Sequence, residues 1–376
     1  MEYSLDEKAL IFLSSFNFMT SSKFAKVLEN LNSPSDIFTL SHKELFKLKD
    51  ELKTNYEILI DGLTKYNEKE FFEPLNKRGI YCLTIISQNY PKKLLNLKNP
   101  PYFLYYVGNI DLINSPSVAI VGSRMVSGYG RIITTRFSKE LAKSGLTIIS
   151  GLADGVDKIS HEGALEVGGN TIAVMGGGFN HIFQISNIEL AREIGKKGLI
   201  LTEYYLDVEP SRYTFPTRNR IIAGLSDAVL ITEARAKSGS SYTKEYADSL
   251  GINVYCVPGN ITSEFSGGTN YWIKNNEAIC VLSSSDILKD LGYNVEYSFG
   301  KDKKRKGIQQ TFNLLKMDLS KEEKLICDFL KNEEQSFAYL QEKTGFSSQT
   351  LNTYLTTLEI NGIIKRLAGN TYIFAE

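Results

Sequence analysis

The chain has 376 residues, 42% apolar and 23% charged, an ordinary composition for a globular protein long enough for two or three domains. Lysine plus arginine equals aspartate plus glutamate at 43 each, so any polyanion site must be a local patch rather than bulk positive charge. No apolar run approaches about 18 residues, no signal-peptide pattern is present, and the four cysteines lack metal-finger or disulfide-framework spacing. We therefore expect a cytoplasmic protein without a membrane span and without a metal site.

Residues 1–75 carry apolar side chains at helical spacing between short polar breaks, which predicts a small helical domain. A helix-hairpin-helix module that grips a DNA backbone is one alternative, and a SAM-like packing module is another. The glycine-centred hairpin of the DNA-gripping module is missing, because Phe16-Asn17-Phe18-Met19 occupies the turn region. A packing or partner-binding role is therefore the favoured interpretation.

Residues 76–291 alternate between short apolar, β-rich runs and helical stretches. The runs are 81–85, 102–107, 117–121, 146–149, 171–175, 199–201, 228–232, 254–257 and 278–282. Such alternation is typical of an α/β fold with a mostly parallel sheet covered by helices on both faces, in a Rossmann-like arrangement. Ligands of these folds bind at the carboxyl ends of the strands, and the first two runs look like additions in front of this core.

Residues 292–318 include the basic run 301–306 without apolar period, and we interpret them as a solvated linker. Residues 319–376 predict helices at 321–331, 337–344 and 348–361, followed by a hairpin with a Gly-Asn turn, which is a winged-helix-like outline. This segment has six basic and eight acidic side chains, a net charge of −2. Because domains that read DNA grooves are normally basic, we favour protein–protein contact for it.

The run Val118-Ala119-Ile120-Val121 reads as a strand buried on both faces, and Gly122, Ser123 and Arg124 follow it before a helical stretch from about residue 128. A strand that feeds a glycine turn and a helix N-terminus predicts an anion site with outward-pointing backbone N–H groups. The Arg124 guanidinium is suited to phosphate.

Small-residue loops also follow the later runs, so several helix N-termini should meet on one edge of the sheet. They include Ser150-Gly151, Gly176-Gly177-Gly178, Ser238-Gly239-Ser240, Pro258-Gly259 and Ser266-Gly267-Gly268, with Phe215, Arg218, Asn219 and Arg220 in the segment before the run 228–232. One glycine turn is weak evidence for a ligand. Several turns on one edge, with three arginines beside them, favour an extended anionic ligand.

No dinucleotide GxGxxG pattern and no GxxxxGK[ST] loop occurs, so no cofactor is predicted. Asp157 and His161 stand four residues apart and could form an acid–base pair or half of a metal site, but a hydrogen-bonded pair that fixes its loop is favoured. Glu233 is more plausible as a loop-organising acceptor than as a base. We predict no catalytic residue.

Taken together, several motifs resemble the DNA processing protein A (DprA/Smf) family over roughly 80–285. They are 118–124, 150–157 with His161, 215–226, Glu233-Ala234, Ser238-Gly239-Ser240 and Val257-Pro258-Gly259. The resemblance implies a non-catalytic protein that binds single-stranded DNA with an extended Rossmann domain, dimerises, and loads RecA recombinase during natural transformation.

By position, the resemblance implies that Gly122, Ser123 and Arg124 form a phosphate-binding loop. Arg218, Asn219 and Arg220 would add charge, Phe215 would stack on a base, and Lys244 would reach the strand backbone from one turn beyond the Ser238-Gly239-Ser240 loop. Ser150 and Gly151 complete the expected nucleic-acid-binding residues.

Two departures from the family pattern occur, where Ile182-Phe183 replaces a Tyr-Pro and Asn276-Glu277 replaces a Gly-Ala. We expect the first to alter the pocket wall and the second to change only a turn, and we expect neither to touch the charged loops. The alternative function is a Rossmann-type enzyme acting on a nucleotide or phosphosugar, but Ser266-Gly267-Gly268-Thr269-Asn270 only partly matches the PGGxGTxxE loop of such enzymes. A transcription regulator that uses the C-terminal segment is weakened by that segment's negative charge.

Overall fold

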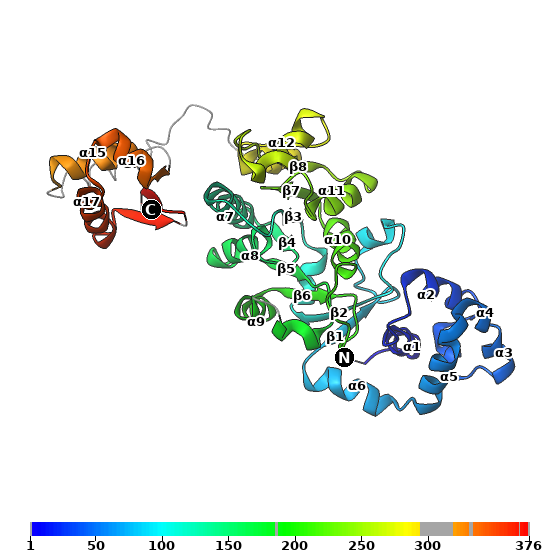
Figure 1. The fold of residues 1–376 in the computed structure, drawn as a ribbon. Helices are drawn as coiled ribbons and strands as arrows, with labels where there is room; N and C mark the ends of the chain where they lie inside the picture. Colours follow the sequence, from blue (N-terminus) through cyan, green and yellow to red (C-terminus); the bar gives the residue numbers. More distant parts are fainter. Residues whose placement is uncertain (1, 185–186, 294–318, 331–333, 368, 375–376) are drawn as a thin grey trace. The chain divides into compact units, whose positions relative to one another are not determined.

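The computed structural model describes residues 2–184, 187–293, 319–330, 334–367 and 369–374. The described residues up to 293 form one compact unit and those from 319 form a second (Figure 1). The predicted boundary at residue 75 falls inside the first unit, and the predicted division into domains stays a prediction. Most of the predicted linker, residues 294–318, lies outside the described residues.

A nine-stranded sheet in the order β1-β2-β6-β5-β4-β3-β7-β8-β9 is the centre of the first unit. The neighbours from β6 to β9 pair in parallel, whereas β1 and β2 add antiparallel strands at one edge. The strands are β1 Tyr81–Thr84, β2 Phe103–Gly108, β3 Ser117–Val121, β4 Thr147–Ser150, β5 Thr171–Val174, β6 Leu199–Thr202, β7 Ala228–Ile231, β8 Val254–Cys256 and β9 Ile279–Cys280. The predicted α/β fold with a mostly parallel sheet is confirmed.

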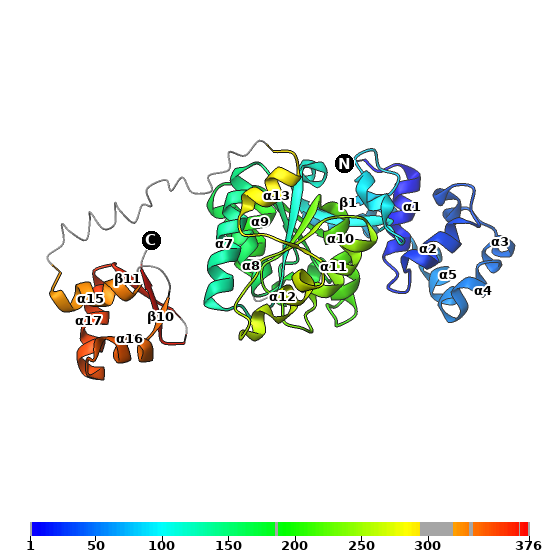
Figure 2. The ribbon, with the colours of Figure 1, turned by 90° about the horizontal axis from the view of Figure 1, so that it is seen from above.

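Helices cover both faces of this sheet (Figure 2). On one face lie α7 Gly128–Lys143, α8 Val156–Glu166, α9 Ile188–Lys197 and α13 Ser284–Asp290, and on the other lie α10 Thr214–Leu225, α11 Ser240–Ser249 and α12 Gly267–Lys274. Residues 118–121 of β3 are all apolar because both faces of the strand are covered. Val118 and Ile120 pack under α7 and α8, while Ala119 and Val121 pack under α10.

The N-terminal helices pack against the β1–β2 edge of the sheet. They are α1 Leu5–Ser14, α2 Ser21–Leu28, α3 His42–Phe46, α4 Lys49–Leu52, α5 Tyr56–Lys65 and α6 Glu68–Lys77. Short 3-10 turns occur at η1 Pro34–Phe38, η2 Lys53–Asn55, η3 Lys92–Asn96, η4 Ile110–Asn114, η5 Phe179–Gln184 and η6 Glu264–Ser266. Ser14 of α1 hydrogen bonds to Tyr105 of β2, and the Tyr3 hydroxyl accepts from the Cys82 backbone N–H at 2.8 Å. One apolar cluster joins these helices to β2, β5 and β6.

The second unit contains α15 Lys321–Leu330, α16 Phe337–Thr344 and α17 Ser348–Ile360, with a three-stranded sheet in the order β10-β12-β11. Its strands are β10 Gln335–Ser336, β11 Ile364–Leu367 and β12 Thr371–Phe374. These elements lie within a few residues of the three helices and hairpin that the sequence predicts. The winged-helix assignment stays a prediction.

Candidate nucleic-acid interface

A cavity of about 580 Å³ opens at the carboxyl ends of β3 and β7, between the loop after β3 and the first turns of α10 and α11. We call it the basic cleft, because its charged lining consists of five cations and one carboxylate: Arg124, Arg212, Arg218, Arg235, Lys237 and Asp157. The strand order reverses between β4, β3 and β7, which is where open parallel sheets bind their ligands. A chain of zero net charge therefore concentrates positive charge at its ligand-binding edge.

The loop after β3 is built by close packing. The Ser123 N–H donates to the Glu233 carbonyl at 2.9 Å, and its carbonyl accepts from Val156 N–H at 3.1 Å. A Cβ at Gly122 would lie 2.6 Å from the Glu233 carbonyl oxygen, so only glycine permits this approach. The expectation of outward-pointing N–H groups is therefore wrong at Ser123, because the neighbouring strand's loop uses that donor.

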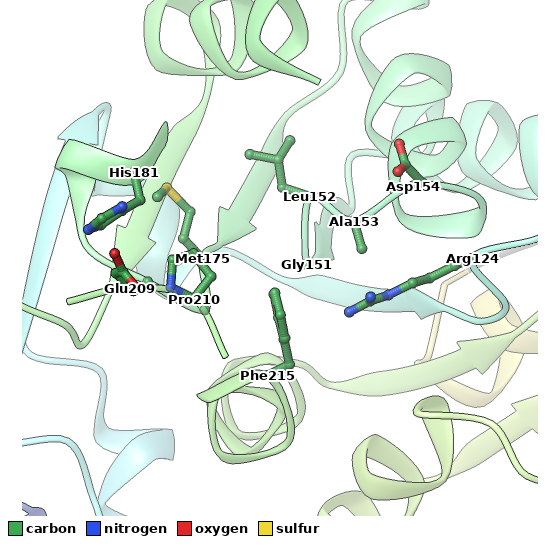
Figure 3. A pocket seen from close by; sticks show the side chains of 12 residues that line it. Arg124, Gly151, Leu152, Ala153, Asp154, Met175, His181, Glu209, Pro210 and Phe215 are labelled. Atoms are coloured by element: carbon green, nitrogen blue, oxygen red, sulfur yellow. The ribbon is translucent and has the colours of Figure 1, made fainter. Parts of the chain in front are cut away.

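Arg124 is exposed in the cleft, and its Cζ lies 4.8 Å from the centroid of the Phe215 ring (Figure 3). Within the described residues it has no carboxylate at ion-pair distance. Phe215 projects from the first turn of α10 and holds the guanidinium by a cation–π contact. Arg124 and Phe215 thus offer a phosphate-binding cation and a stacking face at one point.

Arg218 is buried at 3% exposure, and its Nε and Nη1 donors bind protein acceptors. Nη1 donates to the Gly151 carbonyl at 2.7 Å and to the Val174 carbonyl, and Nε donates to Asn219 Oδ1 at 3.1 Å. Burial lowers the Arg218 pKa to about 10, and the nearby Asp157 carboxylate opposes that shift. Arg218 lines the base of the cleft, but its hydrogen bonds join the ends of β4 and β5.

Arg220 and Lys244 lie outside the cleft lining and have partners of their own. Arg220 forms a buried ion pair with Glu203 at 2.6 Å and donates to the Asn99 carbonyl at 3.1 Å. Lys244 Nζ lies 2.8 Å from Asp248 and 3.3 Å from Glu277.

The second departure from the family pattern therefore has a larger effect than the sequence suggested. Asn276 adopts the turn with a φ of 55°, which asparagine tolerates better than most residues. Glu277, however, pairs with Lys244. The departure thus reaches Lys244 in α11, a predicted site residue that lies outside the charged loops.

The first turn of α11 forms the opposite wall of the cleft. Ser238, Gly239 and Ser240 line it, and the Asn219 amide donates to the Gly239 carbonyl at 3.3 Å. A Cβ at Gly239 would meet nothing within 4 Å, so packing does not require glycine there. Thr243 is 1% exposed, lines the cleft, and its Oγ1 has no hydrogen-bond partner among the described residues. An open helix N-terminus with an unpaired buried hydroxyl is suited to an anion.

The segment from the end of β4 into α8 contains four of the residues considered from the sequence: Ser150, Gly151, Asp157 and His161. Ser150 is fully buried and donates to the Ile120 carbonyl at 2.6 Å. His161 hydrogen bonds through Nδ1 to Thr171 Oγ1 at 2.7 Å, and its Nε2 has no partner in the described part of the chain.

The predicted hydrogen-bonded pair of Asp157 and His161 is therefore wrong. Asp157 lies near the Arg218 cation instead, and burial raises its pKa against the opposing effects of that cation and of hydrogen bonds from Ser150 and Ala153. The helical spacing of four residues is correct, but each side chain finds its partner on another element.

Glu233 is buried at the end of β7 and holds the start of α7. Its carboxylate accepts from the Ser127 N–H at 3.0 Å and from the Ser127 hydroxyl at 2.5 Å. A Cβ at Gly130 would overlap this carboxylate. The prediction of a loop-organising acceptor is confirmed.

A second cavity of about 370 Å³, the apolar pocket, shares Arg124, Ala153 and Phe215 with the basic cleft. Figure 3 shows Met175, Pro210 and His181 at its far end, and Leu152 above. Gly151, which the sequence places in the site, lines this pocket rather than the basic cleft.

The basic cleft also contains polar side chains that the sequence did not indicate, among them Arg212, Arg235, Lys237, Tyr242 and Thr243. Arg235 and Lys237 follow β7 in the same loop as Ser238, so the rule that strand-end loops bind ligands could have found them. The sequence contains no comparable signal for Arg212 and Tyr242, because the places of their side chains depend on where α10 and α11 begin.

Two negative findings apply to the described residues alone. No cluster of three or more histidine, cysteine or acidic side chains there could hold a metal ion. No helix in the same residues has the length and apolarity to cross a membrane.

Comparisons with known proteins identify a family for this chain. A family model for DNA recombination-mediator protein A matches residues 81–292. The protein Smf of Synechocystis is 39% identical over 240 residues, which span 63% of this chain and 60% of that relative.

Two solved structures are also similar. The X-ray structure of DNA processing protein A from Streptococcus pneumoniae is 31% identical, with a TM-score of 0.65 over 79% of this chain and 100% of that one. The structure describing the single-stranded DNA binding mode of DNA processing protein A from Helicobacter pylori is 34% identical, with a TM-score of 0.52 over 56% of this chain and 95% of that one. The family model covers more than half of the chain, from β1 to the end of the sheet. The chain therefore belongs to the DNA recombination-mediator protein A (DprA/Smf) family.

Proposed function

We propose that the basic cleft binds single-stranded DNA through the phosphates, without sequence preference. The observation that carries this proposal is the local excess of cations, with Arg124 exposed over the Phe215 ring and without an ion pair in the described part of the chain. Positive grooves with an aromatic stacking face are the usual means of holding a single strand. The relative from Helicobacter pylori, whose structure concerns single-stranded DNA binding, supports the same assignment.

Within the cleft, Arg124 and the first turn of α11 contact phosphates, and Phe215 stacks on a base. Lys237 and Arg212 are exposed and add to the electrostatic attraction. Arg218 positions this surface from below, because its donors bind protein carbonyls.

We further propose that the bound strand is handed to RecA recombinase during natural transformation, that the protein acts as a homodimer, and that it has no catalytic activity. Family membership supports the first two proposals. The third is supported by Glu233, which fixes the start of α7 through Ser127. Light scattering tests the dimer, and RecA filament assembly on strands coated with single-strand-binding protein tests the delivery.

Salt-dependent binding of a fluorescent (dT)20 tests the main proposal. We expect Arg124→Ala to weaken binding and to reduce the slope of log K against log salt by about 0.7, the contribution of one phosphate contact on a single strand. Arg136→Ala is the matched control, because Arg136 is exposed on α7 and pairs with Glu140. If Arg124→Ala binds (dT)20 with unchanged affinity and slope, the cleft is misassigned. Turnover of a nucleoside monophosphate, lost in Glu233→Gln, would favour an enzyme instead.

A further inference from the structure

A third cavity of about 300 Å³ lies on the other side of α10 from the basic cleft, between the α1–α2 segment and the loop after β6. We call it the aromatic pocket, because aromatic rings dominate its lining: Phe16, Phe24, Tyr102, Phe103, Tyr204 and Tyr213 are among them. It is built jointly by the N-terminal helices and by the sheet unit. Thr217 and Arg220 of the motif at 215–226 line it, but the proposed binding site in the basic cleft does not include it.

The two cavities meet at the start of α10. Arg212 lines the basic cleft, and the next residue, Tyr213, lines the aromatic pocket. Their side chains contact each other, with the Arg212 guanidinium 4.8 Å from the Tyr213 ring centroid and a hydrogen bond of 2.7 Å to its hydroxyl. Tyr213 and Phe215 are two residues apart on the helix and therefore point to different sides of it.

Tyr213 is 68% exposed, although it stands at the opening of an aromatic pocket. Tyr204 instead donates its hydroxyl to the Thr214 carbonyl at 3.3 Å and is half-buried. An exposed ring that is held by an arginine and adjoins a basic surface is the arrangement in which bases stack along single strands.

Charge within the aromatic pocket does not oppose a polyanion. Its carboxylate, Glu203, is compensated by the buried ion pair with Arg220 at 2.6 Å and also accepts from the Ser21 hydroxyl. The remaining polar lining consists of neutral groups such as Asn17, Thr20 and Thr217.

We infer that the single strand held in the basic cleft continues over the start of α10, and that Tyr213 stacks on one of its bases at the mouth of the aromatic pocket. This inference rests on the proposed function. It makes the N-terminal helices part of the nucleic-acid surface rather than a separate packing module, and it predicts a footprint longer than the cleft alone.

Binding of two oligonucleotides, (dT)6 and (dT)20, by the full chain tests this inference. We expect Tyr213→Ala to weaken (dT)20 binding about tenfold, equal to about 1.4 kcal/mol and within the range for one base–aromatic stack, while (dT)6 binding stays within twofold. Tyr213→Phe, which keeps the ring, should retain parental affinity. Tyr271→Ala is the control, because Tyr271 is a 58% exposed tyrosine of α12 that lines neither cavity.

Each result has a defined meaning. Unchanged (dT)20 binding by Tyr213→Ala overturns the extended footprint, and so does an equal loss for both lengths, which would place Tyr213 within the cleft site itself. If the parent protein binds neither oligonucleotide, the proposed function fails instead. Photocrosslinking with an oligonucleotide that carries 5-iodouracil at each position in turn should give an adduct at Tyr213 only for bases beyond those that crosslink near Phe215. An adduct pattern without Tyr213 would contradict the inference.

Discussion

Replacing Arg218 with methionine separates the structural role of this residue from the DNA-contacting role that the sequence suggests. Arg218 is 3% exposed and donates to the carbonyls of Gly151 and Val174, which end β4 and β5. It also lies beside the buried Asp157 carboxylate, whose pKa it lowers against the effect of burial. Methionine keeps much of the side-chain volume but removes every donor.

The expected loss of stability is about 3–5 kcal/mol, the typical cost of leaving a buried charge, here that of Asp157, without the cation that offsets its burial. The two carbonyls left without a donor act in the same direction, at about 1–3 kcal/mol for each unsatisfied group. These contributions overlap because they concern one network, so their sum is not expected. Adding Asp157→Asn to Arg218→Met should recover part of the loss, because it removes the uncompensated carboxylate.

Urea denaturation at pH 7, followed by far-UV circular dichroism, measures the effect. Salt-dependent (dT)20 binding by the folded variant is measured in parallel. If Arg218→Met is within about 1 kcal/mol of the parent in stability yet loses a salt slope of about 0.7, then Arg218 contacts phosphate directly and the structural role is refuted.

Two further substitutions test the cleft wall and the buried histidine. Gly239→Leu should fold normally, because its Cβ enters open space, but the leucine side chain should fill the cleft and weaken (dT)20 binding at least tenfold. Gly267→Leu, at the start of α12, is the control and should leave (dT)20 binding unchanged. Equal affinities of the two variants for (dT)20 would show that DNA does not contact the first turn of α11. Burial lowers the pKa of His161 from 6.5 to about 3, so the neutral ring stabilises the fold above pH 6.5 and this contribution is lost as the pH falls toward 3. Between pH 7 and pH 5, the free energy of unfolding measured in urea should fall by about 2 kcal/mol through this histidine, and His161→Gln should lack that fall. An identical decline of the free energy of unfolding in both proteins would contradict the lowered pKa.

The sequence by itself determined the sheet and the edge at which the site lies. Residues 118–121 are apolar without interruption, and a strand covered by helices on both faces requires that pattern. The alternation of strands and helices then brings the following loops to one edge, because parallel strands all end there. Gly122, Arg124, Phe215 and Gly239 accordingly line one cleft at this edge, since their positions follow from local pattern and connectivity.

Only the tertiary structure decided what each charged side chain does. Arg124, Arg218 and Arg220 look equally available in the sequence, yet only Arg124 is exposed in the cleft without an ion pair within the described residues. The partners of the other two stand far away in the chain, such as Gly151 for Arg218 and Asn99 for Arg220. No local pattern encodes such contacts, because they depend on how separate elements pack and on which groups lose water as they do so.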